Sequence, residues 1–127
     1  KASTPRPARD LYTSDWFQKA SAYAMRVADK WYILSAKHGL LAPDTVIAPY
    51  DETLNTMRAA VRRAWAARVG QDLGGLLSPG DHVIFLAGQR YREGLIDPVQ
   101  RMGCTVEIPM EGLGIGQQLG WLKKHLE

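Results

Sequence analysis

Residues 31–39 read WYILSAKHG, a continuous apolar run that stops abruptly at a small and polar segment. A short apolar run without alternation is typical of a strand buried on both faces, which is the usual setting of a parallel strand. We therefore predict a buried strand near residues 31–35. The polar segment Ser35-Ala36-Lys37-His38-Gly39 is then expected at the carboxyl end of that strand.

Two more strands are predicted near residues 83–87 and 104–109, where apolar residues cluster. Apolar residues at helical spacing predict helices between and around the strands, with Ser14 capping the first of them. These helices fall near residues 14–27, 56–77, 90–102 with an interruption at Pro98, and 115–126. Strands that alternate with helices imply crossover connections. The expected fold is α/β: a mainly parallel three- to four-stranded sheet with helices on both faces, in a single domain of residues 1–127. Residues 1–10 are expected to form an arm, and an upstream strand is expected to complete the sheet.

Composition places the chain among ordinary globular proteins. Hydrophobic residues make up 46% and charged residues 23% of its 127 residues. No apolar run is long enough for a membrane span, and no signal-peptide pattern is present. The single cysteine, Cys104, opens an apolar strand and is expected to be a buried thiol, which favours a cytoplasmic location. His38, His82 and His125 lie far apart in sequence, so we predict no metal and no cofactor.

The arginines offer a candidate nucleic-acid contact. The net charge of +3 and the pI of about 9.2 permit such contact without requiring it. In residues 56–77, Arg58, Arg62 and Arg63 are expected to face the nucleic-acid backbone, with Arg68 beside them. The alternative is a solvated helix face that contacts nothing.

All three predicted strands end in polar or glycine-rich segments. Because parallel strands deliver their carboxyl ends to one edge of a sheet, we expect these segments and the 40–55 loop to line one pocket. The candidate catalytic residues are Asp51, Glu111, Lys37 and His38. The candidate substrate-binding residues are Ser35, Tyr50, Gly88, Gln89, Arg90, Tyr91, Gly112, Gly114, Gly116 and Gln117.

Each of these residue types has a chemical role that fits a nucleobase ligand. Tyr50 and Tyr91 can hold a base, and a glutamine at 89 or 117 can read its edge. Lys37 and Arg90 can hold phosphates, His38 can move a proton, and Asp51 or Glu111 can assist cleavage of an N-glycosidic bond. The plainer alternatives are solvated turn residues, a proline–tyrosine packing corner and a flexible glycine turn.

The motif Leu34-Ser35-Ala36-Lys37-His38-Gly39-Leu40-Leu41, followed by Pro43 and Pro49-Tyr50, resembles the signature of the YaaA-type peroxide-stress proteins. Nearly the whole chain is similar to a small bacterial family of uncharacterised domains related to them. That family shares Asp10-Leu11-Tyr12, the segment from Gly88 to Tyr91 and a closing Gly-Leu-Gly-Ile-Gly-Gln run at residues 112–117. The resemblance implies DNA binding, a link to oxidative damage and kinship with base-handling enzymes. The chain is much shorter than a YaaA protein.

Together these patterns predict a DNA-base-processing domain, most concretely a DNA glycosylase-like hydrolase acting on a damaged or modified base. Two alternatives stay open: a non-catalytic nucleic-acid-binding module of a stress response, and an enzyme acting on a free nucleotide or nucleoside. The expected partner is DNA or a nucleobase or nucleotide ligand, with no membrane contact. The oligomeric state is not predicted.

Overall fold

The computed structural model describes residues 1–127, and the chain divides into two compact units. Unit 1 comprises Lys1–Ile33, Leu41–Tyr50 and Met110–Glu127, and unit 2 comprises Leu34–Leu40 and Asp51–Pro109. None of the helices could cross a membrane: α3, the longest, has 16 residues, and none reaches the apolar length that a crossing needs.

Unit 1 is built on two long helices, α2 (Asp15–Val27) and α6 (Ile115–Leu126), which pack against each other. As predicted, Ser14 caps α2, and its hydroxyl accepts a hydrogen bond from the Phe17 amide at 3.1 Å. Tyr23 of α2 meets Trp121 of α6 edge-on, with ring centroids 5.0 Å apart. Both helices therefore form where the apolar spacing places them.

Residues 6–10, which were expected to belong to a polar arm, lie in a strand and a helix in the structure. β1 (Arg6–Pro7) pairs antiparallel with β4 (Val46–Ile47), and α1 (Ala8–Leu11) follows directly. Ala8 and Leu11 are fully buried in a cluster that includes Ile47. Burial of these two apolar side chains is the physical reason that this segment is held in place.

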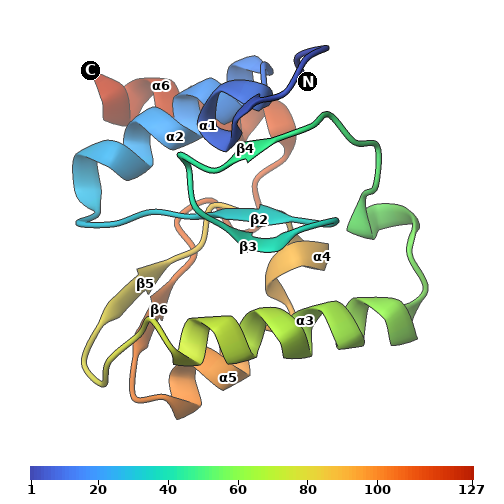
Figure 1. Ribbon diagram of the computed structural model, residues 1–127. Helices are drawn as coiled ribbons and strands as arrows, with labels where there is room; N and C mark the ends of the chain where they lie inside the picture. Colours follow the sequence, from blue (N-terminus) through green and yellow to red (C-terminus); the bar gives the residue numbers. More distant parts are fainter. The chain divides into compact units, whose positions relative to one another are not determined.

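Unit 2 contains a short 3-10 helix, η1 (Leu54–Thr56), followed by α3 (Ala59–Gly74). The strands β5 (His82–Ile84) and β6 (Thr105–Glu107) pair in parallel, with Val83 opposite Val106, as the sequence predicts for these two segments (Figure 1). Between them lie α4 (Gln89–Arg92) and α5 (Ile96–Arg101), so the predicted helix over 90–102 is two helices. Pro98 does not cause the break. It lies in the first turn of α5, where a missing N–H is tolerated.

The predicted mainly parallel sheet of three or four strands is absent, and this prediction is corrected. Three separate two-stranded sheets are present, and β2 (Ile33–Ser35) pairs with β3 (Gly39–Leu41) rather than with β5 or β6. The reason lies in residues 36–38, which form a tight turn between the two strands. Gly39 has φ +71°, a backbone conformation that glycine adopts without strain, and the chain reverses there into β3.

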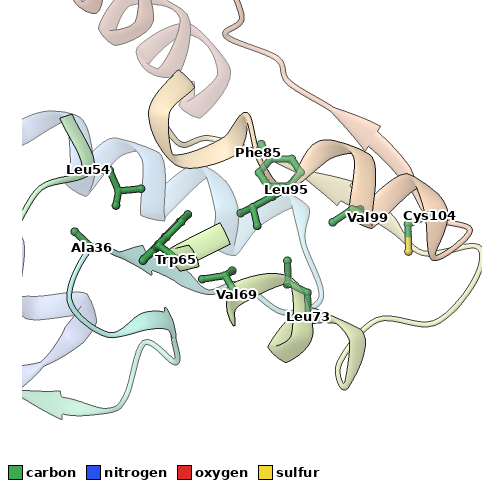
Figure 2. Close-up of a cluster of buried hydrophobic side chains, with 9 residues drawn as sticks. All are labelled: Ala36, Leu54, Trp65, Val69, Leu73, Phe85, Leu95, Val99 and Cys104. Carbon is green, nitrogen blue, oxygen red and sulfur yellow. The ribbon is translucent and has the colours of Figure 1, made fainter. Parts of the chain in front are cut away.

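The core of unit 2 forms where α3 meets the surrounding loops and helices. Figure 2 shows the nine buried side chains of this cluster, which come from the 36–38 turn, η1, α3, α5 and the connecting segments. They are Ala36, Leu54, Trp65, Val69, Leu73, Phe85, Leu95, Val99 and Cys104. Cys104 is a buried thiol, as the sequence predicts. This core holds α3 against the segments that carry most of the predicted site residues.

Candidate ligand site

The predicted site residues fall into two groups, one in each unit. Unit 2 holds Ser35, Lys37, His38, Asp51, Arg58, Arg62, Arg63, Gly88, Gln89, Arg90 and Tyr91. Unit 1 holds Tyr50, Glu111, Gly112, Gly114, Gly116 and Gln117. The two candidate catalytic carboxylates, Asp51 and Glu111, therefore belong to different units, and a single pocket that contains both stays a prediction.

The Ser35 turn is built by its own sequence. Ser35 is fully buried, and its hydroxyl accepts a hydrogen bond from the His38 amide at 3.0 Å, which closes the turn. A β-carbon at Gly39 would lie 3.4 Å from both the Arg68 and the Val69 side chains of α3. Ser35 and Gly39 thus shape the turn, while Lys37 and His38 are exposed at its tip.

Trp65 and Tyr91 connect this turn to two other segments of unit 2. The Trp65 indole N–H donates a hydrogen bond to the Ser35 carbonyl at 2.9 Å. The Tyr91 ring stands edge-on to the Trp65 ring at an interplanar angle of 88°, with centroids 5.8 Å apart. The Tyr91 hydroxyl lies 3.3 Å from both the Thr53 hydroxyl and the Leu54 amide, whose N–H donates to it. Three distant stretches of sequence, near residues 35, 53 and 91, therefore converge around one pair of aromatic rings.

Helix α4 places its residues on two sides. Its first turn begins at Gly88, whose carbonyl accepts hydrogen bonds from the Tyr91 amide at 3.0 Å and the Arg92 amide at 3.2 Å. A β-carbon at Gly88 would meet no atom within 4 Å, so nearby atoms leave room for a side chain there. Gln89 and Arg90 are exposed, while Tyr91 turns inward to Trp65 and Thr53.

Asp51 is exposed and lies two residues before Thr53, close in sequence to the converging segments. Glu111 is exposed as well. An exposed carboxylate is well solvated, so neither residue lies in the desolvated surroundings that are typical of a catalytic acid.

The predicted arginine patch is divided by the structure. Arg62 and Arg63, together with Arg90, line a groove of about 620 Å³ between α3 and the α4–α5 region, whereas Arg58 precedes α3 outside the groove lining. Arg62 turns inward and is only 18% exposed. Its Nη1 donates to the Met57 carbonyl at 2.6 Å.

In unit 1, Tyr50 belongs to the core and is 8% exposed. Its hydroxyl hydrogen-bonds with that of Tyr12, and the Lys1 amine lies 4.5 Å from its ring centroid. The proline–tyrosine packing corner therefore describes its position better than an open stacking platform.

The glycine-rich segment of unit 1 leads into α6. Gly112 has φ +81°, and the Gly114 amide donates to the Gln117 side-chain oxygen at 3.0 Å. Gln117 therefore caps the first turn of its own helix. Gly116 is exposed, and a β-carbon there would meet no atom within 4 Å.

Sequence reasoning missed two residues that define the unit 2 groove, Glu93 and Gly94. A β-carbon at Gly94 would lie 2.7 Å from the Ala66 β-carbon, so this glycine allows the α4–α5 connection to approach α3. The sequence signal for this connection is Gly94 itself, a glycine inside the helix predicted over residues 90–102.

Fold and site together define a small α/β protein whose predicted site residues divide between its two units. Residues 1–124 match a family of unknown function (DUF6884), and the chain belongs to this family. It is also similar to the "Uncharacterized protein YfjM" of Bacillus subtilis (strain 168), at 36% identity over 125 residues. That alignment covers 97% of this chain and 82% of the Bacillus protein. No solved structure matches the chain.

Proposed function

We propose that this chain is a nucleic-acid-binding domain whose ligand site lies in unit 2. The observation that carries the proposal is the convergence of three segments around Trp65 and Tyr91. Functional sites are commonly assembled from loops that a rigid core holds together, and the buried cluster around Trp65 supplies that core.

The exposed residues at this convergence have the chemistry of a nucleic-acid ligand site. Lys37 and His38 project at the tip of the Ser35 turn, and Gln89 and Arg90 are exposed on α4. Cationic side chains suit phosphates, and amide side chains can pair with base edges. The resemblance of residues 34–41 to the YaaA-type signature agrees with this proposal, because that motif forms the turn itself.

A second candidate is the base-processing activity that the sequence suggests, a glycosylase-like cleavage of an N-glycosidic bond in DNA. Of the two carboxylates considered for it, Asp51 is favoured, because it shares unit 2 with Lys37 and His38 and lies close in sequence to Thr53. In this mechanism the carboxylate stabilises the positive charge that develops on the sugar or activates water. Because Asp51 is exposed, this mechanism requires that a bound strand exclude solvent from it.

Binding and catalysis can be tested in one series. Fluorescence anisotropy with labelled single-stranded and duplex oligonucleotides should show binding that weakens as salt rises, and free nucleotides should compete poorly. Unchanged anisotropy with every oligonucleotide at low salt would contradict the proposal. Base release from DNA that carries modified bases then separates the two candidates. An Asp51→Asn variant that keeps binding and loses base release supports catalysis, and wild-type protein that releases no base leaves the binding function alone.

A further inference from the structure

The groove between α3 and the α4–α5 region is a separate feature of unit 2. Small residues make much of its lining, including Ala59, Ala66, Ala67, Gly70 and Gly94. The walls meet closely, because a β-carbon would lie 2.7 Å from Ala66 if added at Gly94 and 4.0 Å from Pro98 if added at Gly70. The groove therefore has a mainly apolar floor, and its volume of about 620 Å³ lies in the range typical of ligand sites.

The arginines along the groove differ in whether their guanidinium groups contact other protein groups. Glu93, the one acidic residue of the lining, lies 3.7 Å from the Arg62 Nε, and Arg62 also donates to the Met57 carbonyl. Arg62 thus already contacts groups of the protein, and the negative charge of Glu93 opposes its positive charge. Arg63 and Arg90 are exposed, and neither side chain forms a hydrogen bond or ion pair. They leave two free guanidinium groups on opposite walls.

We infer that this groove holds the phosphodiester backbone of a nucleic-acid strand, with Arg63 and Arg90 as the phosphate ligands. This inference rests on the proposed function and assigns the phosphate contacts to particular residues. A guanidinium group presents paired donors that match phosphate oxygens, and a surplus of positive charge remains once Arg62 and Glu93 oppose each other. The apolar floor lets sugars pack without facing unpaired polar groups.

The position of Arg90 links the groove to the proposed ligand site. Arg90 and Tyr91 are neighbours on α4, with Arg90 lining the groove and Tyr91 contacting Trp65 and Thr53. A strand whose phosphates lie in the groove can therefore present a nucleotide toward the segments that converge at Tyr91. An acidic polypeptide offers single carboxylates instead of a regular row of phosphates, and it has no base to present there.

The test compares charge reversals inside and outside the groove. The double variant Arg63→Glu/Arg90→Glu is titrated with a fluorescein-labelled single-stranded oligonucleotide at several salt concentrations. The matched control is Lys123→Glu/Lys124→Glu, which makes the same change in net charge on exposed positions of α6 in unit 1. Thermal unfolding checks that both variants are folded.

The groove variant should bind about tenfold or more weakly than the control, and its plot of log affinity against log salt should be shallower by about 1.4, or ~0.7 for each lost single-strand contact. Equal affinities and slopes for the two variants, with strong wild-type binding, would overturn the groove assignment and leave the proposed function standing. Absence of wild-type binding would overturn both. Displacement of the labelled strand by polyglutamate as readily as by unlabelled strand would assign the groove to an acidic peptide and also overturn the inference.

Discussion

The indole N–H of Trp65 donates a hydrogen bond to the backbone carbonyl of Ser35 across 2.9 Å, and both residues are buried. Through this bond, helix α3 fixes the turn that carries Lys37 and His38. A buried carbonyl that loses a donor is costly because water cannot readily replace the donor. The turn is therefore expected to respond to changes in α3 that touch none of its own residues.

Trp65→Phe should lower the free energy of unfolding by about 1–3 kcal/mol, because it keeps an aromatic ring but removes the donor to Ser35. Urea denaturation measures the loss, and amide hydrogen exchange at His38 should become faster. Since the His38 amide is bonded to the Ser35 hydroxyl, its exchange reports on the turn directly. A stable variant with unchanged exchange at His38 would mean that the Trp65 bond does not hold the turn.

Tyr91→Phe should loosen the segment around η1. The substitution keeps the ring against Trp65 and removes the hydroxyl that contacts Thr53 and the Leu54 amide. The expected loss of stability is about 1 kcal/mol, with faster exchange at Leu54 and little change at His38. Thr53→Val is the partner variant. Because both substitutions break the Tyr91–Thr53 contact, their combined effect should be smaller than the sum of the two.

Arg62 and Arg63 are neighbours in sequence but should differ sharply in their effect on stability. Arg62→Met removes a mostly buried guanidinium that bonds the Met57 carbonyl and faces Glu93, so we expect a loss of about 1–3 kcal/mol. Arg63→Met changes an exposed side chain and should stay within about 0.5 kcal/mol of wild type. Chemical denaturation of both variants checks the contrast, and equal stabilities would show that the inward position of Arg62 is wrong.

Gly94→Ala should destabilise unit 2, because its new methyl group would lie 2.7 Å from the Ala66 β-carbon. Overpacking of this kind typically costs about 1–3 kcal/mol. Ala66→Gly alone should cost about 1 kcal/mol, since glycine is unfavourable inside a helix. The double variant should lose less stability than the two single variants lose together, because Ala66→Gly removes the atom that the new methyl group would meet. Simple additivity in the double-mutant cycle would count against close contact at this point.

The sequence predicts helices better than it predicts strand pairing in this chain. Ser14 marks the start of α2 and apolar spacing marks α6, because both signals are local. Parallel pairing of β5 with β6 was also predictable from apolar runs flanking a helical stretch. The pairing of β2 with β3 was not predicted, because small and polar residues such as those at 35–39 occur both in tight turns and in the loops that follow parallel strands. In the structure, the φ of +71° at Gly39 and the hydrogen bond from the His38 amide to the Ser35 hydroxyl identify the turn.

The candidate site stays a prediction, but its residues divide between the two units. Lys37 and Arg90 were proposed because they follow apolar segments, Asp51 was proposed from the 40–55 loop, and all three lie in unit 2. Of the two readings offered for Tyr50, the structure favours the packing corner, because Tyr50 is buried in one cluster with Leu11. The role of Arg62 could not be read from local patterns, because it faces Glu93, which is far away in the sequence.

A titration of the isotope-labelled chain with a short single-stranded oligonucleotide, followed by backbone amide chemical shifts, locates the ligand residue by residue. The proposed site predicts that the largest changes occur in the Ser35 turn, around Thr53–Leu54 and in α4, three segments that Trp65 and Tyr91 bring together. We expect the amide chemical shifts of all three segments to change until the site is saturated, and we expect no such changes at high salt. Changes confined to α2 and α6, or no change in any of the three segments while the oligonucleotide binds, would contradict a nucleic-acid site in unit 2.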